Sequence, residues 1–136
     1  MSGFDATAPG VPAMEWFAKA ETDLTSARLL LAANGPAETM GFLAQQAAEK
    51  YLKGYLVWQG VPFRKIHDLL ELLNACRTID PAFTMLQAEC AALNPLSVRV
   101  RYPGFSWEFT IEDAQDALTR AERIRALVRQ RLGLVQ

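Results

Sequence analysis

Apolar residues recur from residue 13 onward at alternating steps of three and four positions, the spacing of one face of an α-helix. The pattern predicts a first helix from Ala13 to about Asn34, where Gly35 and Pro36 follow. Glycine tolerates left-handed dihedral angles and proline cannot continue the hydrogen-bond ladder, so the helix should end there. The predicted buried stripe of this helix is Phe17, Ala20, Leu24, Ala27 and Leu31.

A second helix is predicted from about Ala37 to Gln59, and Gly60 with Pro62 ends it. Its apolar face covers nearly half of the circumference, so we expect it to pack against more than one neighbour. That face consists of Leu43, Ala47, Ala48, Tyr51, Leu52, Tyr55 and Leu56. The remaining stripe is polar and consists of Gln45, Gln46, Glu49, Lys50 and Lys53.

Two further helices are predicted in the middle of the chain. The first begins near His67, with Asp68 well placed for the helix dipole, and its core positions are Leu69, Leu70, Leu73 and Cys76. Asp80 followed by Pro81 is typical of a cap and first turn, and the stripe that follows is Phe83, Leu86, Cys90 and Leu93. The segment Leu96 to Tyr102 fits a kinked continuation or an extended stretch, and we favour the kinked helix.

The last helix has the clearest start, because Thr110 and Asp113 form a near capping box. It should end near Leu132, and its buried face is Ala114, Ala117, Leu118, Ala121, Ile124, Val128 and Leu132. No hairpin signal occurs anywhere and most links are short. The sequence therefore predicts an all-α fold, an up-and-down bundle of four long helices plus one short helix. We expect residues 13–136 to form this domain, after a flexible tail at 1–12.

Composition and charge narrow the function. Fourteen basic and fifteen acidic side chains give a net charge of −1, so no overall field attracts nucleic acid or an anionic membrane. The longest apolar run, residues 29–33, is too short to span a bilayer. Cys76 and Cys90 lie on apolar helix faces without metal-ligand spacing. These features predict a cytoplasmic protein with no metal or other cofactor.

Three short motifs resemble a known family when they are taken together. They are the run Gln45-Gln46-Ala47-Ala48-Glu49-Lys50-Tyr51-Leu52-Lys53, the run Lys65-Ile66-His67-Asp68-Leu69, and Arg101-Tyr102-Pro103. Their order and spacing are similar to those of the HEPN domain family, over roughly residues 14–129. The resemblance implies a helical bundle that often dimerises. It also implies a nucleotidyltransferase protein partner, frequently in a toxin–antitoxin pair, or the binding of a nucleotide.

Many members of that family are metal-independent ribonucleases with an arginine followed, after four to six residues, by a histidine. The single histidine here, His67, would need that arginine at positions now occupied by Gly60, Val61 or Pro62. No histidine follows Arg99 or Arg101. The usual imidazole for RNA cleavage is therefore absent from its expected place. We expect a non-catalytic binding module, with a divergent ribonuclease as the alternative and a helical companion completing a transferase site as a third possibility.

The cations of these motifs are the candidate ligand-binding residues. Lys50 and Lys53 lie three positions apart and could hold a phosphate together, or Lys53 could form an exposed ion pair with Glu49. His67 could donate to a phosphate, although capping the third helix is the role we favour.

Arg99, Arg101 and Tyr102 offer two guanidinium groups and a phenol at the edge of an irregular segment, where binding residues concentrate. The alternative is that Arg101 pairs internally with Glu49 or Asp68. Three aromatic residues follow, and they are Phe105, Trp107 and Phe109. They either mark an interface or close the end of the bundle, and we favour the second role for two of the three. The arginines of the last helix read as a solvated face; they are Arg120, Arg123, Arg125, Arg129 and Arg131.

Overall fold

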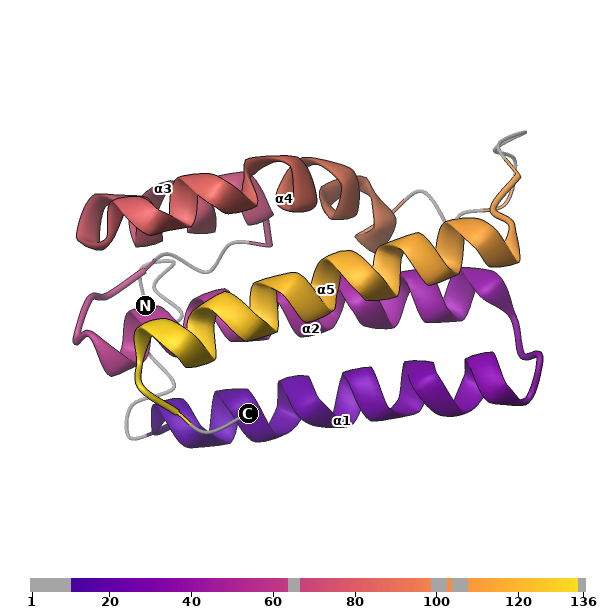
Figure 1. Cartoon of the computed structure of the whole chain (residues 1–136), viewed down its shortest axis with the longest axis horizontal. Coiled ribbons are helices and arrows are strands. Elements are labelled where there is room, and N and C mark those ends of the chain that lie inside the picture. Colours follow the sequence, from indigo (N-terminus) through magenta and orange to yellow (C-terminus); the bar gives the residue numbers. More distant parts are fainter. Residues whose placement is uncertain (1–10, 64–66, 99–102, 104–107, 135–136) are drawn as a thin grey trace.

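The computed structural model describes residues 11–63, 67–98, 103 and 108–134, and these residues form helices joined by short links (Figure 1). In chain order the elements are α1 (Ala13–Ala32), α2 (Ala37–Trp58), α3 (Leu69–Ile79), η2 (Pro81–Leu86), α4 (Gln87–Leu93), η3 (Asn94–Ser97) and α5 (Ile111–Arg131). The two η elements are 3-10 helices. No strand occurs within these residues. The predicted all-α helical bundle is confirmed.

Helix α2 is the central element of the bundle. In Figure 1, α1 lies on one side of α2 and α5, and α3 with α4 lies on the other. The helix contacts α1, α3, α4 and α5, as its wide apolar face predicted. Its largest fully buried side chains are Tyr51, Tyr55, Met40, Leu52 and Leu56. Because α2 contacts every other α-helix, polar groups on the faces that it turns to them have to be accommodated inside the molecule.

The contact between α1 and α2 is built on an aromatic ring over a glycine. Phe17 is 2% exposed and stacks on Tyr51 with a centroid separation of 6.0 Å. A Cβ atom added at Gly54 would overlap the Phe17 ring. The absence of a side chain at Gly54 therefore lets the ring rest directly on the backbone of α2.

The predicted fourth helix is present but is divided into η2, α4 and η3. Asp80 caps η2 by accepting a hydrogen bond from the Ala82 amide at 3.0 Å, as expected. Pro81 is the first residue of η2, where the amide has no partner within the helix in any case. Pro95 lacks an amide proton, so the ladder that continues from α4 loses a bond there and tightens into a 3-10 turn. The kinked continuation reaches Ser97 as η3, and residues 99–102 lie outside the described part.

The start of α5 has the capping box that the sequence indicated. The Asp113 amide donates to Thr110 Oγ1 at 3.1 Å, and the Thr110 amide donates to Asp113 Oδ2 at 2.9 Å. The two bonds satisfy amides that a helix start leaves without partners.

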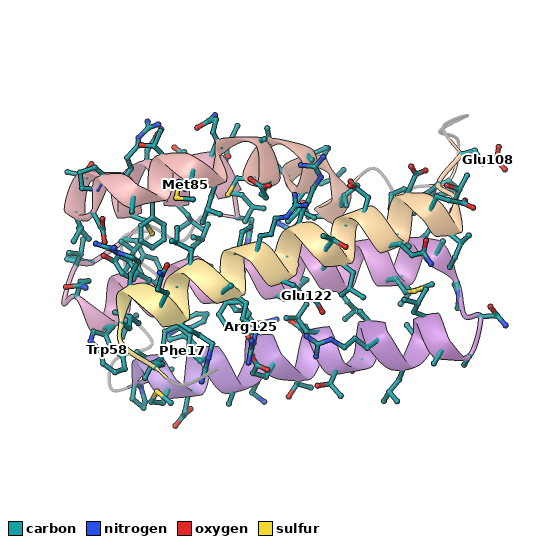
Figure 2. The ribbon with its side chains drawn as sticks, in the orientation of Figure 1. Phe17, Trp58, Met85, Glu108, Glu122 and Arg125 are labelled. Carbon is teal, nitrogen blue, oxygen red and sulfur yellow. The ribbon has the colours of Figure 1, made fainter. Side chains whose placement is uncertain are left out.

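Two expectations about polar surfaces are corrected. Three members of the polar stripe of α2 are buried, because α2 has neighbours on that side too; they are Gln45 at 0%, Glu49 at 5% and Lys53 at 3% exposure. The arginines of α5 are not simply solvated, because several bridge to other elements. Arg125 pairs with Glu21 of α1, and Arg123 pairs with Glu89 of α4. Figure 2 shows Arg125 on the side of α5 that faces α1. Within the described residues, no helix is long and apolar enough to cross a membrane.

Candidate functional site

The buried carboxylate of Glu49 is the centre of a polar network inside the bundle. Glu49 Oε2 accepts from Lys53 Nζ at 3.1 Å and from His67 Nδ1 at 2.8 Å. Its other oxygen accepts from Gln45 Nε2 at 3.5 Å, and Gln45 Oε1 accepts from Gln46 Nε2 at 2.7 Å. Gln45, Glu49 and Lys53 are spaced four residues apart, so they form one stripe along α2. The stripe brings a charged pair to the start of α3.

Lys53 is the cation of this network, and two aromatic rings, Trp16 and Phe63, pack over its ammonium group. Its ammonium lies 5.6 Å from the ring centroid of Trp16 and 5.8 Å from that of Phe63. The two rings contact each other edge to face, and the lysine side chain is only 4% exposed. Cation–π attraction and the Glu49 carboxylate compensate the lost hydration. In this geometry Lys53 supplies the positive charge that faces the buried Glu49 side chain.

His67 is the member of the network that faces solvent. Its side chain is 67% exposed, whereas that of Glu49 is 7% exposed. A carboxylate only accepts hydrogen bonds, so the proton of the neutral ring belongs on Nδ1, and Nε2 is left as an acceptor. Among the described residues, Nε2 has no partner of its own. The ring is therefore fixed in orientation while its second nitrogen stays available to a ligand.

The start of α3 is fastened to η3 next to this ring. Asp68 caps α3 by accepting from the Leu70 amide at 2.9 Å, so the cap is Asp68 and the capping role favoured for His67 is wrong. Asn94 accepts from the Leu69 amide at 2.9 Å and donates to Asp68 Oδ1 at 3.1 Å. Because the cap needs only the Asp68 carboxylate, the His67 imidazole is available to Glu49.

Lys50, the other predicted lysine, points toward α1. Its ammonium pairs with Asp23 at 2.6 Å, and the two side chains are 25% and 16% exposed. Lys50 and Lys53 thus have different carboxylate partners, although they lie three residues apart. The structure brings Lys53 and His67 together on Glu49 and does not join Lys50 to them through that carboxylate.

The remaining predicted site residues, Arg99, Arg101 and Tyr102, lie outside the described part of the chain. The nearest described element before them is η3, which ends at Ser97 and carries the Asn94 link to Asp68. Phe109 is described and half-buried, and its ring would meet a Cβ atom at Gly41. It packs against the core, in line with the plugging role preferred for most of the loop aromatics.

The central role of Glu49 in the site, and the cover formed by Trp16 and Phe63, were not predicted from the sequence. The available signal was the spacing of Gln45, Glu49 and Lys53, three polar residues in register on a helix with an otherwise apolar face. Among the described residues, no cluster of histidine, cysteine and carboxylate side chains could hold a metal ion. What the arrangement offers is one oriented imidazole with a free acceptor nitrogen, backed by a buried ion pair.

Comparisons with known proteins agree with this fold. The family model of the HEPN domain matches residues 13–131, and the chain belongs to the HEPN domain family. It is similar to the crystal structure of an archaeal HEPN homologue, with a TM-score of 0.72 and 30% sequence identity. The match covers 88% of this chain and 97% of that one. No curated protein matches the chain.

Proposed function

We propose that this protein is a non-catalytic HEPN binding module whose His67 face binds the phosphate group of a nucleotide. The nucleotide is either free or held by a nucleotidyltransferase protein partner, and the pair acts as a toxin and antitoxin in the cytoplasm. The observation that carries the proposal is the oriented, 67% exposed His67 ring on a buried Glu49–Lys53 pair. Protonation of Nε2 on binding would give the ring a second donor for a phosphate oxygen.

The predicted contacts around that ring complete the proposal. Lys53 is too buried to reach a ligand freely, so its role is to stabilise the carboxylate that orients His67. Lys50, Arg99, Arg101 and Tyr102 remain the predicted direct contacts, because arginine forks suit phosphate oxygens and a partly exposed lysine supplies a point charge.

The test uses the fact that the chain contains one histidine, so its ring protons give unambiguous NMR signals. We expect ATP to shift the His67 Hε1 resonance saturably and adenosine, which has no phosphate, to leave it unchanged. Glu49→Gln should weaken ATP binding at least tenfold. Lys19→Gln, at an exposed lysine of α1, is the matched control and should bind as the wild type does. Equal shifts with ATP and adenosine contradict the proposal.

The partner is tested separately. Affinity capture from the native host should recover a nucleotidyltransferase, and sedimentation should show a homodimer of the free protein. If no nucleotidyltransferase is recovered and calorimetry shows no nucleotide binding, the proposed function fails.

One observation favours a second candidate function, a divergent metal-independent ribonuclease. A carboxylate on Nδ1 with Nε2 free is the arrangement of a general base, and Glu49 and His67 have it at 2.8 Å. Under this hypothesis, purified protein degrades RNA in the presence of EDTA and His67→Ala does not. If the wild-type protein does not degrade RNA, the ribonuclease hypothesis is excluded, because the His67→Ala variant then has no activity to lose.

A further inference from the structure

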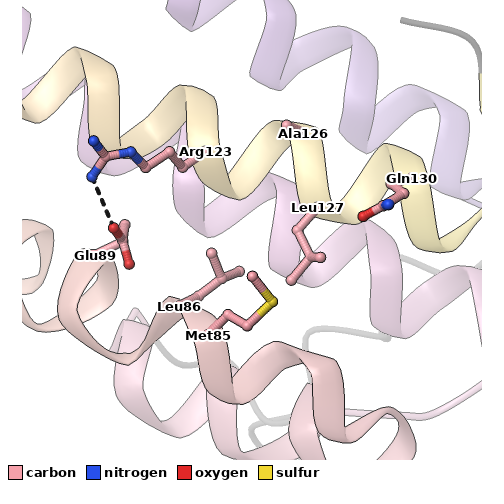
Figure 3. Close-up of a pocket in the computed structure, with 7 residues that line it drawn as sticks. All are labelled: Met85, Leu86, Glu89, Arg123, Ala126, Leu127 and Gln130. Carbon is pink, nitrogen blue, oxygen red and sulfur yellow. Dashed lines mark hydrogen bonds and ion pairs between the residues drawn. The ribbon is translucent and has the colours of Figure 1, made fainter.

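A groove opens between α5 and the η2–α4 segment, away from the His67 network. It has a volume of about 540 Å³. Figure 3 shows Met85, Leu86 and Leu127 converging in its middle, with the linked Glu89 and Arg123 toward one end and Gln130 toward the other. None of the residues that line it takes part in the Glu49 network.

The floor of this groove has the form that accepts a helix. Four of its residues on α5 follow the spacing i, i+3, i+4 and i+7, the pattern of a helix face that packs on another helix; they are Arg123, Ala126, Leu127 and Gln130. Met85 is 73% exposed, and its flexible thioether adapts to irregular apolar surfaces. Exposed Ala126 allows close backbone approach. The face spans about two helical turns.

Two ion pairs connect α5 to the η2–α4 side. The pair of Arg123 with Glu89 lines the groove, and the pair of Arg131 with Asp80, the N-cap of η2, lies next to the groove. Arg123 pairs with Glu89 at 3.1 Å, with the arginine 58% and the glutamate 12% exposed. Arg131 pairs with Asp80 at 2.6 Å, with exposures of 44% and 16%. In both pairs the carboxylate is covered and the guanidinium faces water. The Ala82 amide, and then Arg131, hold the pKa of Asp80 below its ordinary value, so this carboxylate stays charged and fixed.

The two arginines are eight residues apart on α5, about 12 Å along its axis. Spare guanidinium donors therefore flank an apolar floor two turns long. An acidic side chain has room to bind each guanidinium beside the existing pair, because a guanidinium has five donors and one N–O contact leaves most of them unused. The apolar floor suits the apolar side chains of a partner helix, and Arg123 and Arg131 suit acidic side chains on either side of them. A helix with acidic residues one heptad apart and apolar residues between them has this pattern.

We propose that the groove lined by Met85, Leu127 and Arg123 binds an acidic amphipathic helix of a partner protein. This inference goes beyond the phosphate proposal and stands whether or not His67 binds a nucleotide. RNA does not suit the apolar floor, and binding of a second copy of this chain in the groove would contradict the proposal.

The probe is a stapled helical peptide with glutamates at positions i and i+7, leucines at i+3 and i+4, and alanines elsewhere. We expect it to shift the Met85 ε-methyl NMR signal of the full-length protein. Replacing both glutamates by lysine should weaken binding at least tenfold, and replacing both leucines by alanine should do the same. If the glutamate probe leaves the Met85 methyl signal unchanged, or the lysine probe binds equally well, the proposal is overturned.

Two protein variants separate the apolar and charged contributions. Met85→Glu, at a side chain exposed enough to leave the fold intact, should weaken binding at least tenfold. Leu29→Glu is its matched control, since Leu29 is 66% exposed on α1, and it should bind normally. Arg123→Gln should bind the glutamate and lysine probes with similar affinity. Equal loss in Met85→Glu and Leu29→Glu, or a dimer abolished only by Met85→Glu, overturns the proposal in favour of non-specific binding or self-association.

Discussion

Helix α2 buries two stripes of different character, and the contrast shows what each contributes. Against α1, the Phe17 ring lies on Gly54 and Tyr51, so this contact depends on shape. Along the stripe of Gln45, Glu49 and Lys53, the helix buries a charged pair beneath aromatic rings. Apolar packing stabilises the fold directly, whereas a buried ion pair about balances its own desolvation.

The stripe of Gln45, Glu49 and Lys53 therefore contributes little to the free energy of unfolding. Its main contribution is to the orientation of the His67 ring. A leucine pair of similar volume would fill the same space at no loss. A leucine, however, could not accept a hydrogen bond from His67, whereas the Glu49 carboxylate does so and fixes the ring with one nitrogen outward. The difference between the stripes indicates that the Phe17 contact holds the bundle together and that the Glu49 network serves the site.

Removal of Lys53 tests this contrast most strongly. Lys53→Met leaves the Glu49 carboxylate buried without its main counter-charge, and we expect a loss of about 3–5 kcal/mol in the free energy of unfolding. Urea denaturation followed by circular dichroism measures it. The double variant Lys53→Met with Glu49→Leu should recover most of that loss while the NMR signals of His67 show a disordered ring. A single variant costing under about 1 kcal/mol would mean that water reaches the pair.

Filling the space at Gly54 tests the shape-dependent stripe. Gly54→Ala forces Phe17 off its position, and we expect a cost of about 1–3 kcal/mol despite the better helix propensity of alanine. Thermal and urea unfolding measure it. The double variant Phe17→Leu with Gly54→Ala should cost less than the sum of the two single changes, since the smaller side chain removes the overlap. Strict additivity of the two would show that the ring already has room to move.

Lys50→Met sharpens the comparison with a second lysine on the same helix. The Lys50–Asp23 pair is partly exposed, so its loss should lower the free energy of unfolding by only about 0.2–1 kcal/mol. The difference should shrink in 1 M salt, which screens exposed charges. A loss as large as that of Lys53→Met would contradict the distinction between buried and surface pairs.

Much of the fold could be predicted from the sequence because helical periodicity and caps are local signals. The 3–4 spacing of Phe17, Ala20 and Leu24 and the capping box at Thr110 depend only on residues within a few positions of each other. The division of the predicted fourth helix into η2, α4 and η3 was harder to predict from the sequence. Pro95 marks an interruption, but whether the chain tightens into a 3-10 turn or extends depends on contacts with α2.

The site was harder to predict because its geometry depends on which elements meet. The motif residues Lys53 and His67 were found from sequence, yet the burial of Glu49 and Lys53 follows from the placement of Trp16 and Phe63, which come from α1 and the link after α2. Sequence spacing alone treats an i, i+4 pair as a solvated one. For the same reason the sequence did not show that Asp68, and not His67, caps α3. The two residues are adjacent, and the choice depends on the hydrogen bond between His67 and Glu49, which lies on another helix.

Tyr51→Phe should have the smallest effect and the opposite sign. The Tyr51 hydroxyl is buried and has no hydrogen-bond partner among the described residues. An unsatisfied buried hydroxyl costs free energy, so its removal should be neutral or stabilising, within about 1 kcal/mol. The ring, which stacks on Phe17, is retained. A clear loss of stability in urea denaturation would show that the hydroxyl has a partner after all, and that polar bonding also contributes to the stripe that contacts α1.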